Sequence, residues 1–219
     1  MHLRMASLTI LCLVLGAIPT LAQQDLYDNG PINGTTDAWT INFGFELADS
    51  FTLLNNSTVG GFMFGVWEYP GDTLTSVGWE IDSEPLGGTN YGSGTASGSN
   101  LTDHFISVNQ YGYDVDNITV TGLNVALTSR STYWLGLLNA SVPSGDPVYW
   151  DENSGIGCGG DNGHGGGCPS TASSGGVGTD PSEAFTIDGP GGTTPEPNSF
   201  VLLASGILGL AGVLRRKLR

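Results

Sequence analysis

Short apolar segments separated by turn residues fill the centre of this chain, and this pattern restricts the fold more than any other feature. Phe62, Phe64 and Val66 occupy alternate positions, as in a strand that buries one face. Residues 77–81 show the same alternation, and no window between the two ends has a helical apolar period. The sequence therefore predicts an all-β body, a two-sheet antiparallel β-sandwich in jelly-roll or Ig-like order.

Strands are expected wherever such a segment is bounded by glycine, proline, asparagine or aspartate. Turns at 70–72 and 85–88 divide neighbouring segments, because proline presets φ and glycine accepts positive φ. The clearer expected strands are 49–54, 59–67, 74–82, 102–109, 118–127, 132–139, 148–151 and 183–187, and the weaker ones are 38–43, 88–94 and 111–115.

The charge of the chain is distributed very unevenly. The sequence has 21 acidic and 6 basic residues, a formal charge of −15. Between Gln23 and Thr194 there are 20 acidic residues and one base, Arg130, a balance of −19. So acidic a body repels phosphate, which excludes nucleic acid as a partner and makes any anionic ligand a poor fit.

The first 22 residues have the features of a secretory signal peptide. Arg4 gives a positive start, residues 8–18 form an apolar core, and Pro19 ends it. Thr20 and Ala22 provide small side chains before a cleavage site after Ala22. We therefore expect a signal helix at 1–22 and export of the rest.

The C-terminal residues have three parts in a fixed order. A Pro-Glu-Pro triplet precedes the uncharged run 198–214, whose 17 residues would span about 25 Å as a helix. A basic cluster follows, and the positive-inside rule keeps such a cluster cytoplasmic. A transmembrane helix at 198–214 is expected. The triplet is Pro195, Glu196 and Pro197, and the basic residues are Arg215, Arg216, Lys217 and Arg219.

This tail resembles the PEP-CTERM sorting signal of exported bacterial proteins, which is also labelled an ice-binding protein C-terminal domain. The resemblance implies recognition by an exosortase, a membrane protease and transpeptidase, with the triplet as recognition residues and the basic cluster as stop-transfer signal. It further implies anchoring in the inner membrane before processing, then transfer to the cell surface or extracellular matrix. An ordinary anchor that is never cut is the alternative. The body resembles uncharacterised exported PEP-CTERM proteins in segments 70–76, 109–114, 132–135 and 145–150.

The expected organisation has four parts: a signal peptide at 1–22, an ectodomain at 23–189, a linker at 190–194 and the sorting signal at 195–219. Within the ectodomain, residues 153–180 form a glycine-rich loop that holds Cys158 and Cys168. A disulfide between these two cysteines suits an oxidising compartment. The alternative is a metal site that adds Asp161 and His164 to the two cysteines.

Catalytic chemistry has little support in the sequence, and we expect no enzyme activity. No G-x-S-x-G motif occurs, and His104 is expected to be an exposed strand residue. A pair of carboxyl groups for glycoside hydrolysis would come from the acids of the body, although a solvated acidic surface explains them more simply. The obvious candidates are Glu80, Glu84, Asp151 and Glu152.

Aromatic residues support a binding hypothesis, because sugar rings stack on aromatic side chains and β-sandwiches often bind carbohydrate. Trp79 and Trp134 are expected in the core, whereas Trp150, beside the glycine-rich loop, is expected at the surface. The possible ligand-binding residues are Trp67, Trp150, Tyr111 and Tyr113.

A structural calcium ion is a weaker hypothesis, and no other cofactor is expected. Calcium takes six to eight oxygen ligands, which acidic turns between strands can supply. The candidates are Asp114, Asp116 and Asp151.

These features together predict an exported, membrane-tethered surface or matrix protein with a structural or adhesive role. A carbohydrate-binding module of the exopolysaccharide matrix is the first alternative, and a secreted glycan-active enzyme is the second. The expected partners are an exosortase and the membrane, with exopolysaccharide as the partner under the carbohydrate-binding alternative.

Overall fold

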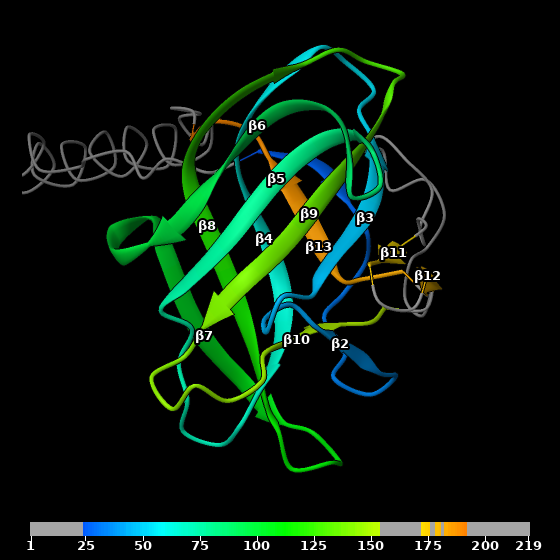
Figure 1. Ribbon diagram of the computed structural model, residues 1–219. Coiled ribbons are helices and arrows are strands. Elements are labelled where there is room, and N and C mark those ends of the chain that lie inside the picture. The colour runs from blue at the N-terminus through cyan, green and yellow to red at the C-terminus, as the bar shows by residue number, and fades with distance from the viewer. Residues whose placement is uncertain (1–23, 154–171, 176–177, 181, 192–219) are drawn as a thin grey trace, which may run out of the picture. The chain divides into compact units, whose positions relative to one another are not determined.

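The computed structural model describes residues 24–153, 172–175, 178–180 and 182–191 (Figure 1). Within these ranges the regular structure is entirely β-strand apart from one 3-10 turn at Gly98–Asn100, so the all-β prediction is confirmed. The expected signal helix, transmembrane helix and disulfide lie outside the described residues. No helix in the described part of the chain is long and apolar enough to cross a membrane.

The strands form two sheets in which every pairing is antiparallel. The first sheet contains β1 (Asp25–Asp28), β2 (Ala38–Thr40), β4 (Ser57–Glu68), β7 (Leu101–Val108), β8 (Asp114–Leu127), β10 (Tyr149–Asp151) and β13 (Phe185–Asp188). The second contains β3 (Glu46–Thr52), β5 (Ser76–Glu84), β6 (Gly87–Ser97), β9 (Thr132–Ser141), β11 (Ala172–Ser174) and β12 (Gly178–Asp180).

Strand β4 is the centre of the first sheet. One of its edges pairs with β8 from Ser57 opposite Leu127 to Glu68 opposite Asp114. Its other edge is shared by β13 and β10, and β1 and β2 continue the sheet beyond them. The β4–β8 pair ends at the Glu68 end, where the β7–β8 turn and the start of β10 also lie (Figure 1).

One hydrophobic core lies between the two sheets. Phe62, Phe64 and Val66 of β4 are fully buried in it, as their alternation predicts. The second sheet has the order β12-β11-β3-β9-β5-β6, and its β5 ring Trp79 lies 6.4 Å from Phe62 between ring centroids. The predicted face of β5, with Val77 and Ile81 buried and Trp79 packed against the core, is also confirmed.

The opposite face of β4 is covered as well. A Cβ atom added to Gly65 would lie 2.7 Å from Ile32 Cγ2 and 3.0 Å from Asp151 Cβ. Trp67, on the same face, is only 5% exposed. Residues around Ile32 therefore cover the outer face of the first sheet, and glycine at position 65 leaves room for them.

Four strands and two tryptophans, Trp134 and Trp150, differ from the sequence-based expectations. The expected strand 111–115 is wrong at 111–113, where Gly112 with φ +85° belongs to the β7–β8 turn and β8 begins only at Asp114. The β1, β11 and β12 strands were not predicted, and the last two lie inside the region expected to be a loop. In β9 the side chains of Tyr133 and Leu135 are buried, so strand alternation turns Trp134 to the other face. The expectation that Trp134 lies in the core is wrong.

Replacing Trp150 by alanine should strongly destabilise the fold. The side chain is 0% exposed, its Nε1 donates to Ala184 O at 3.0 Å, and its ring lies 5.8 Å from that of Phe185. The cavity and the unpaired carbonyl should lower the free energy of unfolding by about 3–5 kcal/mol, measured by urea denaturation. Phe105→Ala, at a residue 53% exposed on the edge strand β7, is the control and should change stability by less than about 0.5 kcal/mol. Equal effects of the two substitutions would contradict the placement of Trp150.

Candidate functional site

An aromatic pocket opens at the Glu68 end of β4, with a volume of about 550 Å³. Four chain segments build it: the residues that lead into β2, the end of β4, the turn between β7 and β8, and the first residue of β10. Its lining combines one indole, three phenols, one carboxylate and one hydroxyl. The lining residues are Thr36, Asp37, Ala38, Trp67, Tyr111, Tyr113 and Tyr149.

The rings of the pocket are packed against one another at different angles. The buried Trp67 ring lies 5.7 Å from Tyr111 and 6.1 Å from Tyr113 between centroids, each at an interplanar angle of 31°. Tyr149 approaches Tyr113 edge-on at 5.7 Å and 75°. Tyr111 is 58% exposed, so its ring remains open to a ligand while Trp67 forms the base.

Asp151 fixes the base of the pocket. Its Oδ1 accepts hydrogen bonds from Trp67 Nε1 at 2.6 Å and from Gly34 N at 3.0 Å, and its Oδ2 accepts one from Asn33 N at 2.8 Å. Burial raises the pKa of Asp151 to about 6, while these three donors act in the opposite direction. One carboxylate thus orients the indole and also holds the loop that leads to Thr36 and Asp37.

Asn109 shapes the turn that carries the two exposed tyrosines. Its Oδ1 accepts hydrogen bonds from Tyr111 N at 2.9 Å and from Tyr113 N at 3.0 Å. Gly112, between them, has φ +85°, a conformation that favours glycine. Gln110 Nε2 donates to Thr35 O at 3.3 Å and joins this turn to the loop before β2. Sequence reasoning missed Asn109, although an asparagine that begins a glycine-containing turn is a usable signal.

The structure brings together three of the four predicted ligand-binding residues, Trp67, Tyr111 and Tyr113. The fourth, Trp150, is a correction: it pairs with Val66 and points into the core, so it cannot contact a ligand at the surface. Its neighbour Tyr149 pairs with Trp67 and lines the pocket instead. The sequence-based prediction chose the wrong face of a short strand.

The calcium candidates do not converge. Asp116 pairs with Val66 and shares the inner face of the first sheet, whereas Asp151 lies against Gly65 on the outer face. Asp114 accepts a hydrogen bond from Gly71 N at 2.9 Å. Across the described ranges, no three His, Cys, Asp or Glu side chains are grouped so that they could hold a metal ion. A structural calcium stays a prediction.

A carboxyl cluster lies behind the pocket, on the inner face of the same sheet end. Glu68 is 0% exposed, and neither of its oxygens has a hydrogen-bond partner among the described residues. Burial, followed by the charges of Asp103 and Asp116, raises the pKa of Glu68 to about 8. Burial also raises the pKa of Asp116 to about 7. The β4–β5 connection closes over the cluster, because Leu74 N donates to Asp103 Oδ2 at 2.7 Å.

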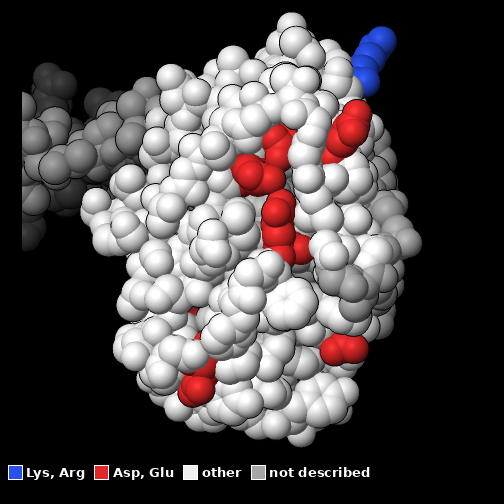
Figure 2. Space-filling view, viewed as in Figure 1, with Lys and Arg blue, Asp and Glu red and all other residues white. Residues whose placement is uncertain are grey.

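Further carboxyl groups form a row on the outside of the second sheet. Figure 2 shows acidic side chains down the face where Figure 1 draws β5 and β9. Glu80 lies beside Glu46 across Gly136, which has no side chain to separate them. Burial raises the pKa of Glu80, and a hydrogen bond with Glu46 adds to the shift. Burial likewise raises the pKa of Asp82 to about 6.

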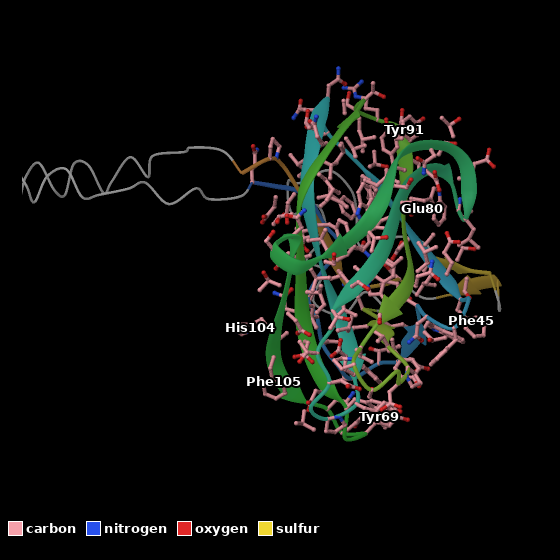
Figure 3. The ribbon with its side chains drawn as sticks, turned by 60° about the vertical axis from the view of Figure 1, so that its left-hand side comes forward. Phe45, Tyr69, Glu80, Tyr91, His104 and Phe105 are labelled. Atoms are coloured by element: carbon pink, nitrogen blue, oxygen red, sulfur yellow. The ribbon has the colours of Figure 1, made fainter. Side chains whose placement is uncertain are left out.

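The candidates for glycoside hydrolysis are not assembled at one place. Glu80 is on β5 of the second sheet and Asp151 supports the pocket base in the first. Glu152 is buried and accepts a hydrogen bond from Trp39 Nε1. Figure 3 shows His104 beside Phe105 on β7, far along the molecule from Glu80. Among the described residues that line the pocket, Asp37 is the one with a carboxyl group.

Comparisons with known proteins add no relative. No protein-family model matches the sequence, and no curated protein matches it.

Stability should fall as the pH rises, because several buried carboxyl groups hold protons more tightly in the folded state than in the unfolded state. For Glu68 the pKa rises from 4.5 to about 8 on folding. Between these values the folded state binds more protons, so its stabilisation is complete below about pH 4.5 and is lost as the pH passes 8. Thermal unfolding followed from pH 5 to pH 9 should show a falling melting temperature.

The Glu68→Gln variant should flatten this dependence. At pH 5 it should be about as stable as the native protein, and at pH 9 it should be more stable, because it removes a buried ionised carboxylate. Glu84→Gln, at an exposed position on the end of β5, is the control and should leave the pH dependence as it is. An unchanged slope in Glu68→Gln would contradict the assignment of the proton to Glu68.

Proposed function

We propose that this protein is an exported surface or matrix protein that binds polysaccharide through the aromatic pocket. The observation that carries the proposal is the exposed Tyr111 ring above the buried Trp67, with Tyr113 and Tyr149 beside them. The flat C–H faces of sugar rings pack on such aromatic surfaces, and a few polar groups then fix the orientation. Thr36 and Asp37 at the rim supply those polar groups.

The rigidity of the pocket favours a ligand-binding function over the role of a passive coat protein. Asp151 fixes the base ring with a hydrogen bond of 2.6 Å, and Asn109 fixes the turn that carries the exposed ring. Preorganised rings lose little conformational entropy when a ligand binds. The described lining residues include one carboxyl group, which favours binding over hydrolysis, because hydrolysis ordinarily needs two carboxyl groups on either side of the glycosidic bond.

The route to the surface belongs to the same proposal. Residues 1–22 serve as signal peptide, and Pro195, Glu196 and Pro197 with the run 198–214 serve as the PEP-CTERM-like sorting signal for an exosortase. The two sheets form a β-sandwich of jelly-roll or Ig-like kind, and Cys158 pairs with Cys168 after export. The strongly acidic body, with Arg130 as its one base, suits a protein that stays soluble outside the cell.

Removal of the exposed ring should weaken binding to polysaccharide. Exopolysaccharide from the producing cell, immobilised on a sensor surface, should retain the full-length protein, and Tyr111→Ala should lower the affinity by about fivefold through loss of roughly 1 kcal/mol of ring contact. Tyr91→Ala, at a 43% exposed tyrosine of β6 in the second sheet, is the matched control and should bind as the native protein does. Equal affinity of native protein and Tyr111→Ala would place binding elsewhere, and no retention at all would leave a passive coat protein.

Changing the sorting triplet should block processing. Glu196→Ala with Pro197→Ala should leave a full-length protein in the membrane fraction, because the protease loses the residues that it recognises. The intact mass of the surface-exposed protein is the measurement, and Thr194→Ala just before the triplet is the control. The same mature mass in the triplet variant and the native protein would show that the triplet does not direct cleavage.

A further inference from the structure

We propose that the aromatic pocket recognises a protonated amine, so that its ligand is an amino-sugar polysaccharide with free amino groups. This inference rests on the proposed carbohydrate-binding function and names the ligand class of the same pocket. Two independent observations carry it, the arrangement of the rings and the charge around them.

The rings at the pocket and beside it stand at several angles to one another. Tyr113 meets Tyr149 at 75° and Tyr69 at 76°, with centroids 5.7 Å and 5.1 Å apart, whereas Trp67 is tilted by 31° to Tyr113. Rings at steep angles form the walls of a cage instead of one flat platform. An organic cation in such a cage can lie over the negative face of the exposed Tyr111 ring and beside the other rings, which is how aromatic side chains usually recognise ammonium groups.

The charged groups that the described residues place at the cage are acidic. Asp37 lines the pocket, and its Oδ1 accepts a hydrogen bond from Ala38 N, which fixes the carboxylate at the rim. Asp151 lies beneath Trp67, bonded to its Nε1. A hydrogen bond with Tyr113 raises the pKa of Tyr69 and burial raises that of Tyr149, and the charge of Asp146 adds a smaller contribution to both.

No cation of the body balances these groups. Arg130 is the only Lys or Arg between Gln23 and Thr194, and its N donates to Leu53 O beside the start of β4. The pocket lies at the end of that strand, whose 12 residues span roughly 35–40 Å. Such a distance is several Debye lengths at physiological ionic strength, so Arg130 does not offset the field at the pocket.

A saccharide amine fits this site better than a metal ion. Divalent cations need several converging oxygens, and the described residues hold no such group. A sugar ring with an amino group uses both parts of the pocket, because its C–H face packs on Tyr111 while its ammonium group approaches Asp37. An acetylated amino sugar has the same ring without the charge, which gives a direct comparison.

The decisive experiment compares two oligosaccharides that differ only in acetylation. Calorimetric titration of the full-length protein with a β-1,4-glucosamine tetramer and with the N-acetylglucosamine tetramer, at a pH where the amines are protonated, should favour the free amine by about tenfold. Tetramethylammonium chloride should displace the glucosamine tetramer at concentrations where sodium chloride does not.

Variants of two residues separate the ring contact from the charge. Asp37→Asn should weaken binding of the glucosamine tetramer and leave that of the acetylated tetramer unchanged. Tyr111→Ala should weaken binding of both, and Tyr111→Phe should retain both, because it keeps the ring face. Tyr91→Ala and Glu84→Gln lie in the second sheet and should behave as the native protein does.

Each other outcome overturns a defined part of the proposal. Equal affinity for the two tetramers, without competition by tetramethylammonium, would overturn the amine site and keep the carbohydrate function. Direct binding of tetramethylammonium, titrated alone, without binding of either tetramer would overturn the carbohydrate function. Tighter binding of a lysine tetramer would also overturn it, and would point to a basic peptide. No binding of any probe would overturn both.

Discussion

Buried carboxyl groups in a body with a single arginine are the constraint on which this fold depends. A body with 20 acidic residues and one arginine cannot satisfy its buried acids with ion pairs, yet an unsatisfied buried charge is costly. Donors from the chain therefore take the place of cations. Asp49, for example, accepts hydrogen bonds from Glu183 N at 2.7 Å and from Ser182 Oγ at 3.1 Å. Glu68 has no such donor among the described residues, and its raised pKa means that the buried carboxyl group is neutralised by holding its own proton.

The same constraint builds the pocket. Asp151 is buried on the outer face of the first sheet, and the donors that satisfy it come from the loop at Asn33 and Gly34 and from the Trp67 indole. The need to satisfy one carboxylate therefore brings the loop against the strand and leaves the indole as the base of a hollow. Rings and acid charge occur together at this place because the acid positions the rings.

The sequence predicted the class of fold and most strands, because alternation in long segments such as 59–67 is unambiguous. It failed where the alternation is short. In the three-residue strand β10 the neighbours Tyr149 and Trp150 are both aromatic, and a shift of one residue exchanges the buried and exposed faces. Tyr133 and Trp134 were also exchanged, although β9 has ten residues, because they too are neighbouring aromatic residues. The strands β11 and β12 consist of small and polar residues, so no apolar pattern in the sequence predicts them. Strand β11 forms by pairing with β3, a contact that the sequence does not show.

Because of Asn109, the backbone course of the β7–β8 turn and the surface that contacts a ligand depend on different groups. The course of the β7–β8 turn depends on main-chain groups bonded to the Asn109 side chain and on Gly112, whereas the contact surface depends on the rings at positions 111 and 113. The tyrosines contribute main-chain groups to the turn, the N–H groups of both and the carbonyl of Tyr113, which accepts from Asn109 N at 2.9 Å. Their side chains are therefore exchangeable without rebuilding it. Related β-sandwich proteins could then bind different ligands after one or two substitutions at positions 111 and 113, while the course of the hairpin stays the same.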